Sequence, residues 1–171
     1  MMETIASQYR RFLIRPTLDA LGLWSPAAEN LLIGTAAHES NGFQAIHQYG
    51  KGPALSMYQI EPATHNDLWE HSIGGYARRN AGGMAMLLDW LPRMFPRGQA
   101  PDAMLLLTDL RYATAICRLL YWRVPRALPA PDDLGGLAGY WKAHYNTVHG
   151  AGHESEWLDA YARHCQEDDR A

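Results

Sequence analysis

Residues 25–42 of the chain read SPAAENLLIGTAAHESNG. Ser25 followed by Pro26 is typical of a helix start, because a serine side chain caps free N–H groups and proline fits the first helical position. Asn41 and Gly42 are typical of a helix end. Apolar residues occupy nearly every face of the turns between these signals, so the sequence predicts a helix that is buried on almost all sides.

Helical periodicity also appears elsewhere, with apolar residues three and four positions apart. The further helices that we expect span about residues 3–21, with a kink or restart at Pro16, and residues 62–69, 84–91, 101–123, 132–145 and 154–166. The helix over 101–123 should be the longest. Residues 43–60 are irregular, and the double glycines that begin at 74, 82 and 135 indicate turns. The sequence therefore predicts a mainly α fold with one irregular loop or small hairpin insert.

Composition limits the classes of protein to consider. The 171 residues suit a single domain, 1–171, and no apolar run is long enough for a membrane span. Fifteen basic and 18 acidic side chains give a net charge of −3, which disfavours a nucleic-acid binder, because such a protein needs a basic surface. Cys117 and Cys165 are expected to be free thiols. The polar residues 1–9 do not resemble a signal peptide.

Glu39 is the first candidate catalytic residue. Positions three, four and seven residues before it hold Ala36, Thr35 and Leu32, so the carboxyl shares a helical face with mainly apolar neighbours. Poor solvent and the negative end of the helix dipole both disfavour a charged carboxylate there, and a protonated carboxyl is what a general acid requires. The alternative is a slightly rotated helix in which Glu39 is an exposed terminal residue.

Two further blocks carry polar groups that suit a sugar ligand. In the block from Gly52 to Thr64, small residues precede Tyr58 and Gln59, and Gln59 can both donate to and accept from hydroxyl or acetamido groups. Tyr58 or Tyr49 could stack on a sugar ring. The alternative is a buried turn that enters a helix. The third block runs over 140–147, and taken alone it indicates a helix end with a capping asparagine.

The three blocks, in this order, resemble the soluble lytic transglycosylase and goose-type lysozyme family of the lysozyme-like superfamily. That family has a Glu-Ser pair at the end of a buried helix, then a Gly-Leu-Met-Gln-like motif followed by Pro and Thr, and then an Ala-Tyr-Asn-Ala-Gly motif. The matching residues here are Glu39-Ser40, residues 56–60 with Pro62 and Thr64, and Ala143 with Tyr145-Asn146. The resemblance covers about residues 31–161 and points to small members that phages or prophages encode.

Four positions depart from the family pattern. Ser56 stands in place of a glycine, Tyr58 in place of a methionine, and Thr147 in place of a small residue. His144 interrupts the third motif. Each change could narrow the cleft or alter its backbone.

The resemblance implies a lysozyme-like helical domain that cleaves peptidoglycan with one glutamate. Glu39 would protonate the β-1,4 oxygen between MurNAc and GlcNAc and then take the proton of the muramic C6 hydroxyl, giving a 1,6-anhydro product. Ser40 and Gln59 would orient the substrate, and Tyr145 would lie beside Glu39. Asn146 would hold the local backbone. The substrate-binding residues implied in this way are Ser40, Tyr58, Gln59, Tyr145 and Asn146.

Two other functions stay open. Glu61 could act as the second carboxylate of a water-using muramidase if it faced the cleft, although its position before Pro62 favours an interaction with the helix dipole. A phage structural or adaptor protein could also keep the fold with weak or no activity.

The sequence also bears on partners and location. No cofactor is expected, and the glycines between His149 and His153 argue against a rigid metal-binding pair, so no metal is predicted. The expected partners are peptidoglycan glycan strands and phage virion proteins, with no nucleic acid. The chain would be made in the bacterial cytoplasm and would act on the cell wall, either as a virion component or at lysis.

Overall fold

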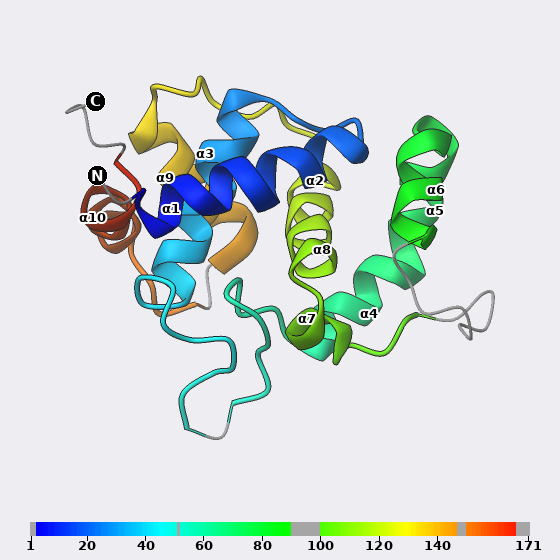
Figure 1. Ribbon diagram of the computed structural model, residues 1–171, viewed down its shortest axis with the longest axis horizontal. Helices are drawn as coiled ribbons and strands as arrows, with labels where there is room; N and C mark the ends of the chain where they lie inside the picture. Colours follow the sequence, from blue (N-terminus) through cyan, green and yellow to red (C-terminus); the bar gives the residue numbers. More distant parts are fainter. Residues whose placement is uncertain (1–2, 51, 90–99, 147–149, 167–171) are drawn as a thin grey trace.

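The computed structural model describes residues 3–50, 52–89, 100–146 and 150–166, and this part of the chain is mainly helical, as predicted (Figure 1). The elements in chain order are α1 (Ile5–Tyr9), η1 (Arg10–Ile14), α2 (Arg15–Ala20), α3 (Pro26–Glu39), α4 (Pro62–His71), α5 (Ile73–Arg79), α6 (Ala81–Asp89), α7 (Leu105–Thr108), α8 (Leu110–Trp122), α9 (Leu134–Trp141), η2 (Lys142–Asn146) and α10 (Glu154–His164). The elements η1 and η2 are single π-helical turns.

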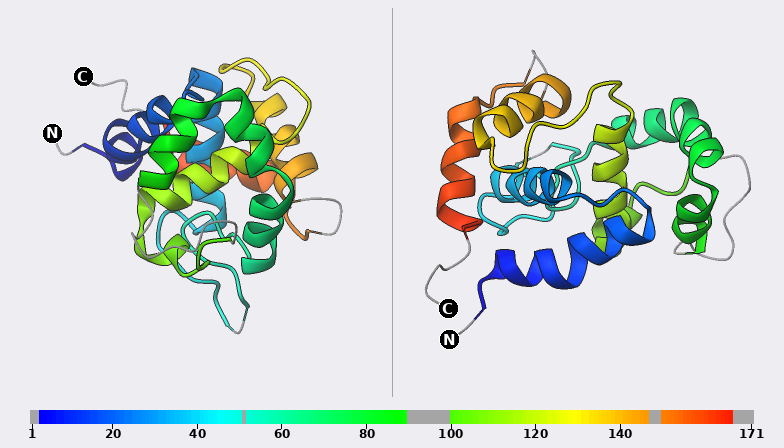
Figure 2. Two further views of the ribbon diagram at one scale, coloured as in Figure 1. Left: turned by 90° about the vertical axis from the view of Figure 1, so that its right-hand side faces the viewer. Right: turned by 90° about the horizontal axis from the view of Figure 1, so that it is seen from above.

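Helix α3 is the buried helix that residues 25–42 predict. Ser25 Oγ accepts a hydrogen bond from Ala28 N, and Pro26 is the first helical residue. All residues from Leu31 to Ala37 are buried. The helix packs against η1, α8, α9 and α10, and Figure 2 shows it between the α1–α2 segment and α9. The core is therefore built around α3.

Gly34 of α3 lies directly against a side chain of α10. A Cβ added at this glycine would overlap the indole ring of Trp157, which is fully buried. Any side chain at position 34 would therefore force the two helices apart.

The first helical segment restarts as an α-helix at Arg15 and Pro16, in agreement with the predicted kink or restart. Elements α1, η1 and α2 follow one another without a break (Figure 1). Pro16 lies in the first turn of α2, directly after the π-helical turn, where a helix tolerates proline. The irregularity therefore lies in the π-helical turn before the proline.

An ion-pair network ties this segment to α3. Arg15 Nε lies 2.8 Å from Glu29 Oε2, and Arg10 Nη1 lies 3.5 Å from Glu29 Oε1. Trp24 Nε1 also donates to Glu29 Oε2 over 2.8 Å. Burial by itself would raise the pKa of Glu29, but the hydrogen bonds from Arg15 and Trp24 and the two arginine charges hold this pKa below its ordinary value. Glu29 is thus a buried carboxylate with its partners in place.

The prediction that residues 101–123 form one helix, the longest of the chain, is wrong. This segment is split into α7 and α8 at Asp109, whose backbone is extended and whose side chain accepts hydrogen bonds from Arg111 N and Tyr112 N. Asp109 therefore starts a new helix instead of continuing one. Among the single α-helical elements that the structure describes, α3 with 14 residues is the longest.

The insert at 43–60 agrees with the prediction of an irregular segment. It contains two isolated antiparallel bridges, His47 with Leu55 and Leu55 with Ile60. In Figure 1 it is the cyan loop that extends below the helices. The double glycines, in contrast, are not turns, because they lie in the first turns of α5, α6 and α9.

Two findings concern the membrane and the cysteines. In the ranges that the structure describes, no helix combines the length and the apolar character that crossing a bilayer requires. Cys117 and Cys165 are both buried free thiols, as predicted.

A chain of hydrogen bonds holds α4 against α8. Trp69 Nε1 donates to the Tyr112 hydroxyl over 2.9 Å, and this hydroxyl lies 2.6 Å from His65 Nε2. His65 Nδ1 lies 3.0 Å from Asn66 Oδ1, which can only accept, so Nδ1 carries the proton and Nε2 accepts from Tyr112. Burial lowers the pKa of His65 more than the hydrogen bond to Asn66 and the charge of Asp102 raise it. The fold therefore favours a neutral His65.

The first prediction concerns stability in mild acid. On going from about pH 7.5 to about pH 5.5, we expect the melting temperature to fall, because the unfolded chain takes up a proton on His65 more readily than the folded chain does. The stabilisation is complete above the ordinary histidine pKa of 6.5 and is lost as the pH falls below it. Differential scanning calorimetry at both pH values measures the fall.

Two variants assign this effect to His65. H65Q should show a smaller fall in melting temperature than the wild type. H144Q removes a less buried histidine whose pKa is also lowered, by burial and by the charge of Arg126, and it should reduce the fall less. An unchanged fall in H65Q would contradict the assignment.

The second prediction concerns the contact between α3 and α10. G34A should lower the free energy of unfolding by about 1–3 kcal/mol, because the added methyl group overpacks the core against Trp157. G82A is the matched control, since a Cβ at Gly82 meets no atom within 4 Å, and it should raise stability by about 0.4–1 kcal/mol. Urea denaturation measures both, and equal effects would rule out the close contact.

Candidate active site

A cleft of about 700 Å³ lies at the C-terminal end of α3. Its walls come from the end of α3, the 43–60 insert, the start of α4, the end of α8 and η2. The predicted site residues that line it are Glu39, Gln59, Tyr145 and Asn146. Residues from all three sequence blocks therefore meet in one cleft.

Glu39 is the last residue of α3, and its side chain is 17% exposed. Trp141 Nε1 donates to Glu39 Oε1 over 3.0 Å. Among the described residues, no hydrogen bond engages Oε2. One carboxyl oxygen is thus oriented by a buried indole, while the other has no hydrogen-bond partner in the part of the chain that the structure describes.

The chain ends α3 at Glu39 through a motif of local hydrogen bonds. Gly42 N donates to Ala37 O over 2.7 Å, and Asn41 N donates to His38 O over 3.3 Å. Asn41 and Gly42 both have positive φ angles, 52° and 73°. This pattern is a Schellman motif in which Asn41 takes the left-handed position after the cap, a conformation that asparagine tolerates better than most residues. The Asn41-Gly42 signal therefore fixes the end of the helix and leaves Glu39 at the cleft.

Ser40 does not contact the cleft, contrary to prediction. Ser40 is fully buried. Its Oγ donates to Ala36 O over 2.6 Å and accepts from Phe43 N over 2.8 Å. Because its one hydroxyl hydrogen is used within the chain, Ser40 caps the helix end and has no donor left for a substrate.

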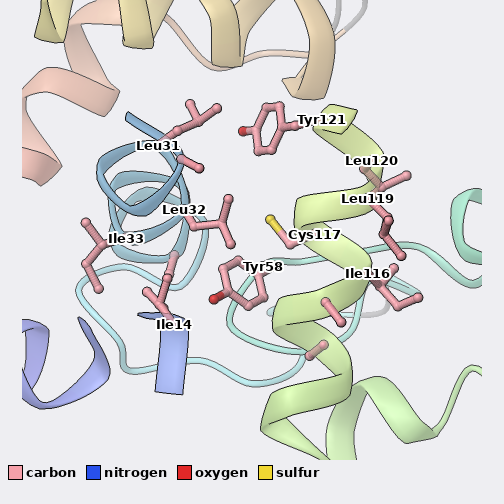
Figure 3. Packing of buried hydrophobic residues seen from close by; sticks show 14 of the residues in the cluster. Ile14, Leu31, Leu32, Ile33, Tyr58, Ile116, Cys117, Leu119, Leu120 and Tyr121 are labelled. Carbon is pink, nitrogen blue, oxygen red and sulfur yellow. The ribbon is translucent and has the colours of Figure 1, made fainter. Parts of the chain in front are cut away.

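Tyr58 is also placed differently from the prediction. Its ring is fully buried between α3 and α8, as Figure 3 shows, and its hydroxyl lies 3.1 Å from Thr114 Oγ1. The ring therefore cannot stack on a sugar. It also does not narrow the cleft, so this departure from the family pattern affects the core and not the site.

Gln59 belongs to a tight turn between two bridge residues. Leu55 and Ile60 exchange backbone hydrogen bonds of 2.9 and 2.8 Å, which fold residues 56–59 back on themselves. Ser56 and Gln59 have φ angles of 66° and 49°. Ser56 thus takes the left-handed conformation that glycine adopts most easily, at the position where the family pattern has glycine. Gln59 Nε2 donates to Ser56 O over 2.8 Å, so the turn orients the amide that lines the cleft.

Tyr145 connects η2 to the same turn. Its hydroxyl donates to Tyr58 O over 2.7 Å, and its ring stacks on Tyr121 with 5.1 Å between centroids. Burial raises the pKa of Tyr145 well above its usual value, so the hydroxyl keeps its proton and remains a donor. Tyr145 therefore fixes one cleft wall to the other.

Asn146 is held by a neighbouring lysine. Lys142 Nζ donates to Asn146 Oδ1 over 2.7 Å and to Gly150 O over 2.9 Å. Lys142 is thus the residue that connects Asn146 with the backbone at Gly150. The prediction that Asn146 holds the local backbone did not include this lysine.

The cleft also contains residues that the resemblance did not assign to the site. Tyr49 lines the cleft and is 69% exposed. Arg123 also lines the cleft, and its guanidinium forms an ion pair with Asp67 at 2.6 Å. His144 lines it too, although in the sequence it marked only an interruption of a motif. Glu61 lies at the N-cap of α4, as its place before Pro62 indicated, and it lines the cleft as well.

No metal-binding group was found in the described residues, where no three His, Cys, Asp or Glu side chains lie close enough to hold an ion. His149, which belonged to the histidine pair considered for metal binding, lies outside the described residues, as does Thr147.

Comparisons of the chain with protein-family models, with curated proteins and with solved structures gave no match. The resemblance to the lytic transglycosylase family therefore stays a prediction that rests on the three sequence blocks.

The third prediction tests the role of Ser40. S40A should lower the free energy of unfolding by about 1–3 kcal/mol, because Phe43 N then loses its acceptor. The matched control is S72A, since Ser72 at the N-cap of α5 makes no side-chain capping hydrogen bond, and its effect should stay within about 0.5 kcal/mol. Urea denaturation followed by tryptophan fluorescence compares the two. A destabilisation no greater in S40A than in S72A would show that Ser40 is not a cap.

Proposed function

We propose that the protein is a peptidoglycan lytic transglycosylase of the lysozyme-like superfamily in which Glu39 acts alone as acid and base. The observation that carries the proposal is the hydrogen bond from Trp141 to Glu39 Oε1, in a cleft that also contains Gln59 and Tyr145. A general acid must be held in one orientation beside its substrate, and this carboxyl is held by an indole that is itself locked in the core.

In the proposed reaction, Glu39 gives its proton to the glycosidic oxygen as the bond from that oxygen to C1 of MurNAc breaks. The resulting carboxylate then takes the proton of the C6 hydroxyl of the same sugar, and O6 bonds to C1. The product is a 1,6-anhydro sugar, and Glu39 is protonated again without consuming water. One carboxyl is enough, because the nucleophile, O6 of the same sugar, is part of the substrate.

The other cleft residues suit a glycan backbone. Gln59 offers an amide, Asn146 a second amide, and Tyr49 an exposed ring at the edge. Amides pair with hydroxyl and acetamido groups, and aromatic rings pack on the apolar faces of sugars. Such a surface has no need of a strongly charged groove, which agrees with the low charge of the chain.

A water-using muramidase is the second candidate, and the position of Glu61 favours it. Glu61 lines the same cleft as Glu39, so the cleft holds two carboxyl groups. In hydrolysing glycosidases the second carboxylate activates water or acts as the nucleophile. If Glu61 had this role, the product would carry a reducing end and no anhydro sugar.

Delivery to the cell wall is part of the proposal. We place the chain with phage-encoded enzymes, as a virion component or a lysis enzyme made in the bacterial cytoplasm. Virion proteins would then be its partners besides the glycan. The adaptor alternative would predict the same partners with no turnover, so measurement of turnover separates the two.

The fourth prediction is the product of digestion. Purified peptidoglycan, digested with the protein and analysed by mass spectrometry, should release 1,6-anhydro muropeptides. E39Q should lower the rate by at least about 100-fold, because it removes the acid and base, while E61Q should retain most of it. E70Q is the matched control, since Glu70 is an exposed glutamate of α4 outside the cleft.

The same measurement decides between the alternatives. Reducing ends without anhydro products, together with loss of turnover in E61Q, would replace the transglycosylase by a muramidase. Full turnover in E39Q would reject the catalytic assignment. A wild type that binds phage particles at fixed stoichiometry and digests nothing would favour the adaptor.

A further inference from the structure

His38 has a buried ring nitrogen without a hydrogen-bond partner. Nδ1 of His38 is inaccessible to solvent and makes no hydrogen bond in the described part of the chain. A buried donor or acceptor without a partner destabilises the fold, so such groups are rare and call for an explanation. The carboxyl oxygen Glu39 Oε1 lies 3.6 Å from this nitrogen, slightly beyond hydrogen-bond distance.

The ring of His38 has little freedom to turn elsewhere. It packs on the indole of Trp141 with 4.5 Å between ring centroids and an interplanar angle of 60°. On another side lies the backbone of Gly152, where an added Cβ would come within 3.4 Å of His38 Cε1. The indole of Trp141 is the same group that donates to Glu39 Oε1. His38, Trp141 and Glu39 thus form one packed cluster at the end of α3.

We propose that His38 is a positioning residue whose Nδ1–H donates to Glu39 Oε1 when substrate fills the cleft. Hydrogen bonds of active sites are often long in the free enzyme and shorten in the complex with substrate, so a gap of 3.6 Å is compatible with this role. The inference rests on the proposed function, because it concerns the carboxyl that would act as acid and base.

The consequence is a defined place for the acidic proton. Oε1 would accept from two N–H groups, the indole of Trp141 and the imidazole of His38. A carboxyl oxygen that accepts two hydrogen bonds is not the one that carries the proton. The proton would therefore reside on Oε2, and the same two donors would steady the carboxylate after the proton has left.

Three substitutions at His38 form the fifth prediction. The amide nitrogen of asparagine reaches the position of Nδ1, whereas that of glutamine reaches the position of Nε2. H38N should keep kcat on peptidoglycan within about threefold of wild type, while H38L and H38Q should lose about 10- to 100-fold, with KM changed by less than about twofold. H71L is the matched control, because His71 is an exposed histidine of α4 outside the cleft, and its kcat should match the wild type.

A second readout does not depend on turnover. Nitrogen-15 NMR of His38 reports whether Nδ1 or Nε2 carries the proton in the neutral ring. We expect the Nδ1–H form in the wild type and a shift of this signal in E39Q. Melting temperatures of the three variants show whether a loss of kcat reflects unfolding.

The outcomes are separable from those of the proposed function. Loss of kcat in H38L with recovery in H38N, together with a protonated Nδ1, supports the proposal. Equal kcat in H38L and wild type, or a His38 protonated at Nε2 alone, overturns it while leaving the role of Glu39 intact. If the wild type digests nothing, the proposed function fails and the role of His38 in catalysis fails with it, whatever the NMR result.

Discussion

Helix α3 is buried on almost every side, so each charged side chain on it needs either a partner or an opening to solvent. It carries two glutamates, one near each end, and their surroundings differ. Glu29 receives two arginines and an indole N–H. Glu39 accepts a hydrogen bond from one indole N–H and lines a cleft. Much of the arrangement around α3 follows from these two requirements.

The contrast separates a structural carboxylate from a reactive one. The partners of Glu29 satisfy its charge, which fixes the first helical segment on α3 but leaves nothing for chemistry. At Glu39 the one donor is neutral, and Oε2 has no partner among the described residues. This is the physical reason to look for chemistry at the end of α3 and not at its beginning.

Local signals made α3 and its ends predictable. Ser25, Pro26, Asn41 and Gly42 act through the hydrogen bonds and φ angles of their own backbone neighbours, and the structure has these bonds. The order of the three blocks similarly led to Glu39, Gln59, Tyr145 and Asn146, which do meet in one cleft.

Other features depend on where individual side chains point, which the sequence pattern did not predict. The left-handed backbone at Ser56 and Gln59 decides that Tyr58 points into the core while Gln59 faces the cleft. Ser40 looked like a site residue because it follows Glu39, but its hydroxyl is drawn to the backbone of the helix end. Asp109 interrupts a periodic apolar run by capping. In each case a tertiary or backbone contact overrides the local pattern.

The hydrogen bonds that assemble the cleft join distant parts of the chain, 102 residues apart for Trp141 with Glu39 and 87 residues apart for Tyr145 with Tyr58. Contacts of such separation form late, because the closure of long loops must precede them. During synthesis, Glu39 emerges from the ribosome long before Trp141 and Tyr145 exist. The nascent protein therefore has its candidate acid but no built site until Trp141 and Tyr145 have been made.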